Sequence, residues 1–504
     1  MSPLAGKFTP SPSLKIRWAV FFTVALLALA VRLPQLGERP MHTDESINAY
    51  ITGGLLAGEK YRYDPQDRHG PALYILAKPV AQLSGAKNFS GLTESELRIS
   101  TVITGVAIVL LFGAGVEIFG FIPCLIAALL FAFAPLPVYY SRYFIHETLF
   151  IAATLGLILT GWRAWQKTSL PCAVLAGFSA ALMLACKETT GIHFFALGLA
   201  AVIGWRFQAV KKLPPLRIWT VLFVTFLFTT ILLFTWGAPN WSALVDLFRS
   251  IPNFAARAGG QGHEKPFSYY ARLLNGSWSG AMILMVAVVG FFIAIRNRST
   301  KPGFITAVYA LFIFVIYSVI PYKTPWLALN FWLPLSILAG IAVEWAWLTL
   351  PKFSRRVMIS TFIIVVGISI AHDTRQLVFR IPADEKNPYA YAHTGEDMLR
   401  LPLRLDELAR QNNLPNPHIA VVADDAWPLP WYLRKFPQTG FWQPGQETGA
   451  ADFFITSTDV SDALVERLKT FRPEFFGLRP NVLLILWSPA TTNSPAGAIP
   501  PAKP

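Results

Sequence analysis

An acidic pair stands in the stretch MHTDESINAY, where Asp44 and Glu45 are adjacent and His42 precedes them. A carboxylate can take the proton of a hydroxyl group as a general base, which accelerates a transfer reaction about 10²- to 10⁴-fold. Carboxylate oxygens are also the hard ligands that Mg²⁺ and Mn²⁺ prefer. A plainer role fits the same residues, because Thr43 or Asp44 could cap a helix that carries Glu45 in its first turn.

A second polar stretch, YRYDPQDRHGPALYIL, contains Asp64, Arg68 and His69. Arg68 and His69 are residue types that bind phosphate through charge and hydrogen bonds. The alternative is a simple loop, because Asp64 before a proline favours a turn and Pro71 suits the first position of a helix. The stretch by itself leaves both interpretations open.

Three further polar stretches lie at the ends of apolar runs. YYSRYFIHETLF carries Arg142, His146 and Glu147, CKETTG carries Lys187 and Glu188, and YKTPW carries Tyr322, Lys323 and Trp326. An ionisable group near a membrane span is usually functional, but one at a helix end can also reach water at little cost. Pairing between loops explains Lys187 and Glu188 equally well, and an interfacial aromatic belt explains Trp326.

The composition shows what kind of protein must position these groups. Of the 504 residues, 54% are hydrophobic and 14% are charged, and the mean hydropathy is +0.45. The hydrophobic fraction and the hydropathy are higher, and the charged fraction is lower, than in soluble globular proteins, so the chain is a polytopic α-helical membrane protein. The net charge of +14 does not indicate nucleic-acid binding, because the basic residues form short clusters between apolar runs. The cysteines, Cys124, Cys172 and Cys186, lie in apolar segments and indicate neither disulfides nor a zinc site.

About eleven apolar runs approach the length of a membrane span. They cover residues 16–32, 99–118, 121–140, 147–165, 170–186, 190–205, 217–236, 279–295, 303–320, 327–349 and 357–371. The first run is expected to be retained as a span, because no small-residue cleavage site follows it. The third run contains Pro123, Pro135 and Pro137, which makes it the least regular.

The basic residues predict the orientation of these spans. With the N-terminus in the cytoplasm, the cytoplasmic loops carry most of the Lys and Arg residues of the short loops. The short outer loops then carry only Arg142, Lys187 and Lys323. The sequence therefore predicts that all five polar stretches lie at the outer face of the cytoplasmic membrane. Their convergence favours a functional site more strongly than any single stretch does.

The predicted domains follow from this topology. Residues 1–371 form a transmembrane domain with outer loops at 33–98 and 237–278, and residues 372–488 form an extracytoplasmic domain. In the latter, HIAVVADDAW, ADFFITSTDV and NVLLILW are typical of short strands and DALVERLKTF of an amphipathic helix, which predicts a small α/β fold. Residues 489–504 are rich in Pro, Ala and Ser and are expected to be disordered.

An acidic pair soon after the first span, followed by many spans and an outer C-terminal domain, is similar to the pattern of GT-C glycosyltransferases. That group includes the protein O-mannosyltransferases and the lipid A aminoarabinose transferases. The chain most closely resembles the flippase-activity-associated membrane family of bacteria and archaea, which is linked to archaeal N-glycosylation. Seven stretches over residues 40–435 carry the resemblance: HTDESINAY, YRYDPQDRHGP, SRYFIHE, CKETTG, YKTPWL, YAYAHTGEDMLRL and WPLPWYLR. Within them, Glu147 takes the place of an aspartate.

The resemblance implies transfer of a sugar from a polyprenyl-phosphate donor to a hydroxyl group of a protein, lipid or glycan. Asp44 would be the general base, and Glu45 and Glu147 the other catalytic carboxylates. The donor phosphate would be bound by Arg68, His69, Arg142, Lys187 and Lys323. The rest of the substrate would be bound by Asp64, His146, Glu188, Tyr322 and Trp326. A monophosphate donor does not require a metal, and Mg²⁺ or Mn²⁺, if bound, would be held by Asp44, Glu45 and Glu147.

Two other functions are compatible with the sequence. One is a flippase or transporter of lipid-linked sugars, and the other is a noncatalytic glycan-assembly protein. A transporter is expected to have polar groups near the membrane midplane and interrupted spans, whereas the charges here lie at the ends of the runs. A noncatalytic protein would tolerate loss of the Asp44 carboxylate, and an enzyme would not.

Overall fold

The computed structural model describes residues 11–66, 68–207, 213–237, 240–260, 262–297, 301–459 and 462–490. The chain divides into two compact units. The helical unit contains Met1–Glu38, Ile51–Pro382 and Lys386–Tyr391, and the sheet unit contains Arg39–Tyr50, Ala383–Glu385 and Ala392–Pro504. The acidic stretch after the first apolar helix therefore belongs to the sheet unit.

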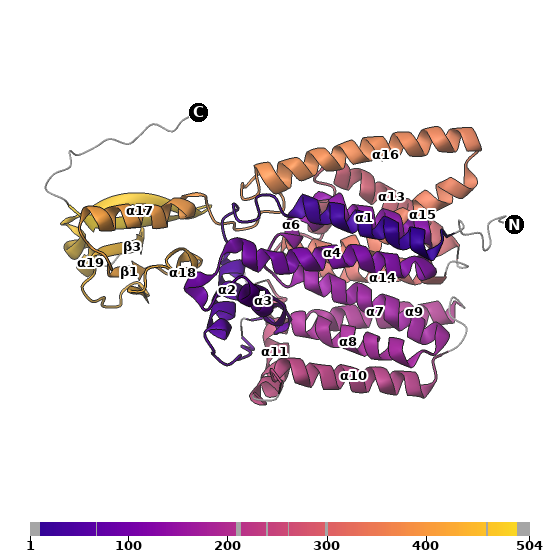
Figure 1. Cartoon of the computed structure of the whole chain (residues 1–504), viewed down its shortest axis with the longest axis horizontal. Helices are drawn as coiled ribbons and strands as arrows, with labels where there is room; N and C mark the ends of the chain where they lie inside the picture. Colours follow the sequence, from indigo (N-terminus) through magenta and orange to yellow (C-terminus); the bar gives the residue numbers. More distant parts are fainter. Residues whose placement is uncertain are drawn as a thin grey trace. The chain divides into compact units, whose positions relative to one another are not determined.

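The long apolar helices of the helical unit lie side by side along a common direction (Figure 1). Long and short helices together, the helical unit contains α1 (Leu14–Arg32), α3 (Ala72–Leu83), α4 (Glu94–Phe119), α5 (Phe121–Phe133), α6 (Pro135–Ser141), α7 (Glu147–Lys167), α8 (Leu170–Cys186), α9 (Thr190–Arg206), α10 (Leu216–Phe234), α11 (Ser242–Arg257), α12 (Tyr269–Leu274), α13 (Trp278–Arg296), α14 (Lys301–Val319), α15 (Leu329–Thr349) and α16 (Lys352–Thr374). Two 3₁₀ segments, η1 (Phe89–Gly91) and η2 (Pro325–Ala328), and a π-helical segment, η3 (Arg375–Arg380), join them. α2 (Thr43–Leu56) begins in the sheet unit and ends in the helical unit.

All eleven predicted apolar runs are helical, but a count of eleven spans is not confirmed. Among the described residues, eight helices are long and apolar enough to cross a membrane, or nine if α5 and α6 form one bent span. The predicted runs at 170–186 and 190–205 are α8 and α9, with 17 residues each. Such a helix is about 25 Å long, which is shorter than a hydrocarbon core of about 30 Å. The chain is thus a multi-pass membrane protein in which α8 and α9 are shorter than a full-length span.

Local sequence explains where helices begin and bend. α4 begins with a capping box, in which Thr93 Oγ1 accepts the backbone N–H of Glu96 and Glu96 Oε2 accepts that of Thr93. Between α5 and α6 the chain bends by 58° at Ala134, whose extended backbone suits the proline that follows. The apolar run at residues 121–140, which was predicted to be the least regular because of its prolines, is therefore a bent pair of helices.

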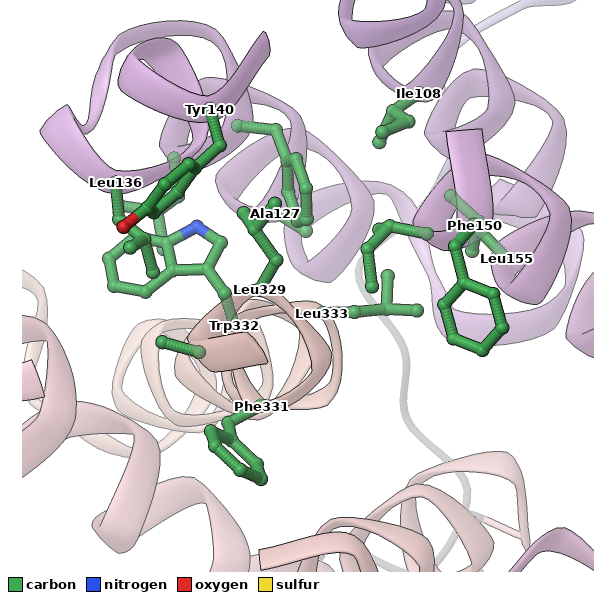
Figure 2. Close-up of a cluster of buried hydrophobic side chains, with 14 of the residues drawn as sticks. Ile108, Ala127, Leu136, Tyr140, Phe150, Leu155, Leu329, Phe331, Trp332 and Leu333 are labelled. Carbon is green, nitrogen blue, oxygen red and sulfur yellow. The ribbon is translucent and has the colours of Figure 1, made fainter. Parts of the chain in front are cut away.

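Among the apolar helices long enough to span a membrane, the segment formed by η2 and α15 is the most deeply buried in the bundle. Figure 2 shows its Trp332 next to Tyr140 of α6, while Phe331 projects from the other side of α15. At Gly290 of α13, a Cβ atom would lie 1.9 Å from the carbonyl oxygen of Leu338. Only glycine permits this close approach of two apolar helices, for which small residues are typically used in membranes.

A buried arginine ties together the ends of three helices. Arg32, the last residue of α1, donates to the carbonyl oxygens of Phe131 and Ala132 at 2.6 and 2.8 Å, and to Ser141 Oγ at 2.7 Å. The two carbonyl groups belong to the last turn of α5, where no helical donor is available. Arg32 thereby fixes the position from which the loop at residues 142–146 departs.

The sheet unit is built on a five-stranded sheet in the order β2-β1-β3-β5-β4. β1 is parallel to β2 and β3, and β5 is antiparallel to β3 and β4. Its elements are α17 (Asp397–Gln411), β1 (Ile419–Val422), α18 (Leu429–Tyr432), β2 (Thr439–Trp442), β3 (Phe453–Ser457), α19 (Asp462–Leu468), β4 (Phe471–Arg479) and β5 (Val482–Pro489).

The small α/β fold predicted for the C-terminal part is confirmed. All four residues of β1 are buried, as expected of a parallel strand that is covered on both faces. Ala420, Val422 and Phe454 pack with Leu464 and Leu468 of α19. Most of the segment expected to be disordered, residues 491–504, lies outside the described residues.

Candidate functional site

The acidic stretch forms the first turn of α2, and its two carboxylates have different surroundings. His42 Nδ1 accepts the backbone N–H of Asp44 at 3.1 Å, and the N–H of His42 donates to Glu45 Oε2 at 3.2 Å. Arg39 donates to Glu45 Oε1 at 3.3 Å, and the Glu45 side chain is fully buried. The Asp44 side chain is 44% exposed, with Oδ2 4.0 Å from His42 Nδ1. Of the two carboxylates, Asp44 is the one that a substrate can reach.

Glu45 and His42 cap the start of α2, a role that the sequence analysis considered for Thr43 or Asp44. The Glu45 carboxylate and the His42 ring satisfy backbone N–H groups reciprocally at the helix start, in the manner of a capping box. The pairing with Arg39 neutralises its charge within the protein. These contacts do not support a catalytic or metal-binding role for Glu45, and they hold the turn that presents Asp44.

Two residues from the C-terminal part of the sheet unit clamp the peptide groups before Asp44. The Tyr432 hydroxyl accepts the N–H of Met41 at 2.8 Å, and the Thr394 hydroxyl donates to the carbonyl oxygen of Met41 at 2.7 Å. The rings of His42 and His393 lie 5.4 Å apart. Because Met41 is fully buried, its two backbone groups depend on these partners. The C-terminal residues therefore position the helix start that carries Asp44.

We expect Thr394→Val to loosen this clamp without unfolding the sheet unit. The loss of one buried hydrogen bond costs about 1 kcal/mol, so the amides of residues 39–46 should exchange hydrogen for deuterium several-fold faster. Thr439→Val is the matched control, because it removes a hydroxyl that bonds the Phe436 carbonyl oxygen in the same unit. Unchanged exchange at residues 39–46 in Thr394→Val would show that the clamp does not restrain them.

A polar cluster in the helical unit joins the start of α7 to the turn between α8 and α9. It comprises Tyr63, His69, Glu147, Lys187 and Glu188. Glu147 forms an ion pair with Lys187, and both side chains are buried. Glu188 accepts hydrogen bonds from the Tyr63 hydroxyl at 2.6 Å and from His69 Nδ1 at 2.8 Å. Three of the polar stretches that the sequence singled out therefore meet in space.

His146 lies beside this cluster as a neutral hydrogen-bond donor. Burial lowers its pKa, and the nearby His69 and Lys187 lower the pKa further. Its Nε2 donates to the carbonyl oxygen of Gly70 at 3.1 Å, and its ring lies 5.4 Å from that of His69. A Cβ on Gly70 would lie 2.4 Å from the Ala185 carbonyl oxygen, so the loop can approach α8 this closely only with glycine.

The end of α11 supports the loop that carries His69. The Phe254 ring is stacked on the His69 ring with centroids 5.6 Å apart. The Arg257 guanidinium lies 5.1 Å from the Phe254 ring and donates to the Gln66 carbonyl oxygen at 2.5 Å. The sequence did not indicate Phe254 or Arg257, although their spacing of three residues places them on one helical face.

Glu188 is held in its charged form. Burial by itself would raise its pKa, but the charge of His69 and the hydrogen bonds from His69 and Tyr63 outweigh burial and lower the pKa below 4.5. A carboxyl group whose pKa is lower in the folded than in the unfolded state stabilises the fold above the unfolded pKa. That contribution disappears as the pH falls through the folded pKa.

We expect Glu188→Gln to lower the free energy of unfolding by about 2 kcal/mol at neutral pH, because charged hydrogen bonds are lost. The difference from the wild type should shrink as the pH falls below 4.5, where the wild-type carboxylate becomes protonated. Unfolding of the detergent-solubilised protein over a pH series measures this difference. Glu59→Gln, at an exposed carboxylate, is the control. A difference that does not vary with pH would contradict the charged state of Glu188.

Arg142 does not have the surroundings of a phosphate ligand. Its guanidinium donates to the carbonyl oxygens of Arg32, Pro34 and Gln35 at 2.8, 2.6 and 3.0 Å. It also lies 4.7 Å from the Phe379 ring. Arg142 therefore caps the end of α1, a structural role that the sequence did not reveal because the carbonyl groups belong to a distant segment.

Lys323 is likewise turned toward the protein. Its Nζ donates to the carbonyl oxygen of Lys265 at 3.0 Å and to that of Ile320. Burial lowers its pKa. This arrangement does not support the predicted phosphate contact.

Of the remaining residues predicted to bind the substrate, Asp64 and Arg68 lie in one loop, and Tyr322 and Trp326 lie elsewhere. Asp64 Oδ1 accepts the N–H of Gln66 at 2.8 Å, as in an Asx turn, and Arg68 is partly exposed in the same loop.

Tyr322 and Trp326 belong to an aromatic group instead. The Tyr322 ring lies 4.8 Å from that of His263, and the buried Trp326 ring lies 6.3 Å from that of Tyr143. These contacts fit packing at the end of the bundle.

Sequence reasoning missed four residues that support the site: Arg39, Tyr63, Arg257 and Thr394. Thr394 and Tyr432 fall within YAYAHTGEDMLRL and WPLPWYLR, which carried the resemblance, but nothing in those stretches shows which residue they contact. Among the described residues, no group of three or more His, Cys, Asp or Glu side chains is arranged to hold a metal ion.

Comparisons with known proteins agree with this architecture. Residues 68–233, about a third of the chain, match the family described as dolichyl-phosphate-mannose-protein mannosyltransferase. No curated protein sequence matches the chain. The residues matched by the family, 68–233, include His69, Glu147, Lys187 and Glu188 of the polar cluster but not Tyr63 or Asp44.

The structure is similar to solved structures at low sequence identity. ArnT from Cupriavidus metallidurans, bound to undecaprenyl phosphate, aligns with a TM-score of 0.63 and 15% identity over 95% of this chain and 99% of its own. The oligosaccharyltransferase AglB from Archaeoglobus fulgidus, in complex with an inhibitory peptide and a dolichol-phosphate, aligns with a TM-score of 0.55 and 13% identity over 96% of this chain and 76% of its own. The arabinofuranosyltransferase AftD from Mycobacteria aligns with a TM-score of 0.50 and 15% identity over 96% of this chain and 41% of its own. The chain is therefore a multi-pass membrane protein with the GT-C glycosyltransferase fold, as the resemblance of its motifs predicted.

Proposed function

We propose that this protein transfers a sugar from a polyprenyl-phosphate donor to a hydroxyl group of a protein, lipid or glycan acceptor. The observation that carries the proposal is the contrast between the two adjacent carboxylates. Glu45 completes the first turn of α2 and is buried, whereas Asp44 is exposed and is not needed to cap the helix. The GT-C fold and the lipid-phosphate ligands of the solved ArnT and AglB structures support the choice of donor.

Asp44 is the general base in this proposal. As the acceptor oxygen attacks the anomeric carbon, the new C–O bond forms and Asp44 takes the hydroxyl proton. The bond between the anomeric carbon and the phosphate oxygen breaks, and the electron pair leaves with the polyprenyl phosphate. Attack from the face opposite the leaving phosphate inverts the configuration of that carbon.

Fixed cations stabilise the negative charge that develops on the leaving phosphate. Arg68 and His69 remain the first candidates, since their loop meets the Glu147–Lys187 pair through Glu188. Arg142 and Lys323 are withdrawn from this role, since their charged groups bind backbone carbonyl oxygens.

Residues in and beside the polar cluster orient the substrate. We assign Glu188 and His146 to hydrogen bonding at the sugar, with Asp64 in the supporting turn. The reaction is proposed to need no metal, because the leaving group is a monophosphate. If Mg²⁺ or Mn²⁺ binds, Asp44 is the exposed carboxylate that would coordinate it. Glu147 and Glu45 already have cationic partners.

The proposed location follows from the distribution of basic residues in the sequence. The N-terminus lies in the cytoplasm, and the acidic stretch and the C-terminal α/β domain lie outside the cytoplasmic membrane. The carrier chain remains in the bilayer while its phosphate and sugar reach the outer face.

Labelled sugar on a mixed pool of polyprenyl-phosphate carriers tests this function in reconstituted vesicles. An enzyme releases free polyprenyl phosphate and moves the label to an acceptor fraction, and Asp44→Asn should stop both. A transporter would move the intact labelled lipid between leaflets without cleaving it, and a noncatalytic protein would do neither. Equal release of polyprenyl phosphate by wild type and Asp44→Asn, at matched levels of folded protein, would refute the proposed role of Asp44.

A further inference from the structure

An apolar groove of about 630 Å³ lies among α1, α5, α13, α15 and α16 of the helical unit. Its walls include Val31, Leu130, Ile283, Val343 and Phe362, one from each helix. The volume lies within the range of about 300–1,000 Å³ that is typical of sites for small molecules. None of the five residues of the polar cluster lines it.

α16, which forms one wall of the groove, is hydrogen-bonded to its neighbours at its C-terminal end. Asp373 accepts hydrogen bonds from the N–H and hydroxyl of Ser279 at 2.8 and 2.7 Å, and the Thr374 hydroxyl donates to the Phe133 carbonyl oxygen at 2.7 Å. These contacts fix α16 to the start of α13 and the end of α5. Farther back along α16, a Cβ on Gly367 would meet no heavy atom within 4 Å, so the space beside it is open.

Arg375 places a positive charge at the end of the groove next to the C-terminal end of α16. Arg375 is exposed, and among the described residues that line the groove it is the only charged one. It is the first residue of the π-helical segment η3, and π-helical turns are frequent at functional sites. Phe379 of the same segment also lines the groove.

This end of the groove is the end of the bundle at which the polar cluster lies. Phe379 is covered by the Arg142 guanidinium, and five residues later Glu147 begins α7 and joins the cluster. An amphiphile in the groove would thus place its head at a membrane surface and its chain along the apolar helices.

We propose that this groove binds one anionic glycerophospholipid, with its phosphate on Arg375 and an acyl chain between α1 and α16. The apolar wall matches an acyl chain, and the single arginine matches a single phosphate, which a guanidinium can hold with two hydrogen bonds. The occupant is a membrane phospholipid rather than the sugar donor, because the sugar of the donor must reach the polar residues and none of the cluster lines the groove. The proposal stands independently of the glycosyltransferase activity.

Native mass spectrometry of the delipidated full-length protein, titrated with phosphatidylglycerol, phosphatidylcholine or undecaprenyl phosphate, tests the proposal. We expect one phosphatidylglycerol to be retained in preference to phosphatidylcholine. Arg375→Gln should weaken its binding about fivefold, as expected for one interfacial cation. Gly367→Leu should abolish retention, because the new side chain enters the open space of the groove.

Each variant has a matched control in the same protein. Arg380→Gln removes an exposed arginine from the same π-helical segment, outside the lining of the groove. Gly198→Leu introduces leucine at a glycine of α9 that also has open space around it. Both controls should retain phosphatidylglycerol as the wild type does.

Three results would overturn the proposal. They are unchanged phosphatidylglycerol binding in Arg375→Gln and Gly367→Leu, equal retention of phosphatidylcholine and phosphatidylglycerol, and preferential binding of undecaprenyl phosphate that Gly367→Leu abolishes. The last would assign the groove to the carrier lipid.

Discussion

Asp44→Asn should lower the rate of sugar transfer about 10²- to 10⁴-fold and leave the protein folded. The magnitude is that of general-base catalysis, because asparagine cannot accept the acceptor proton. The structural cost should be small, since the exposed side chain contributes at most its charge near the helix N-terminus, about 0.3–1 kcal/mol. Transfer per folded molecule and the thermal unfolding midpoint are the two quantities to measure.

Glu45→Gln is the informative comparison at the next position. It weakens the partner of Arg39 and of the His42 N–H, so we expect a loss of about 1.5–3 kcal/mol of stability. Transfer per folded molecule should fall less than in Asp44→Asn. If Asp44→Asn instead unfolds the protein and Glu45→Gln alone stops transfer, the assignment of the two carboxylates is reversed.

Breaking the ion pair between Glu147 and Lys187 should destabilise the helical unit by about 3–5 kcal/mol. Both side chains are buried, so Lys187→Met leaves the Glu147 charge without its cation and Glu147→Gln leaves that of Lys187. The double replacement should be considerably more stable than the sum of the two losses, because it leaves no buried charge. Unfolding free energies of the four proteins, measured in one detergent, give the coupling.

An exposed pair between α7 and α4 provides the control. Lys167 Nζ lies 3.8 Å from Glu117 Oε2, with the two side chains 69% and 52% exposed. Lys167→Met should therefore cost no more than about 1 kcal/mol. Equal losses for Lys167→Met and Lys187→Met would mean that the buried pair is open to water in the membrane.

The path of the chain through the membrane could be predicted because apolar length is a local property. Every predicted run is a helix, and prolines correctly marked the bent pair α5 and α6. The number of full spans does not follow from apolar length alone, because α8 and α9 have 17 residues each and lie at the lower limit of a membrane span.

The residue types of the candidate site were also visible in the sequence. Ionisable groups near membrane spans are often functional, and three of those stretches meet through His69, Glu147 and Glu188. Their motifs predicted the GT-C fold that the structural comparison shows.

Only the tertiary structure decided which of these groups are available for chemistry. Asp44 and Glu45 are adjacent in the chain, but Arg39 and the His42 N–H bind one of them and leave the other exposed. The Arg142 guanidinium donates its hydrogen bonds to carbonyl groups more than a hundred residues away in the chain. The sequence by itself determined the apolar helices and the supply of ionisable groups, because both depend on local composition. Which ionisable groups remain accessible depends on partners brought together by folding, so no local pattern could reveal it.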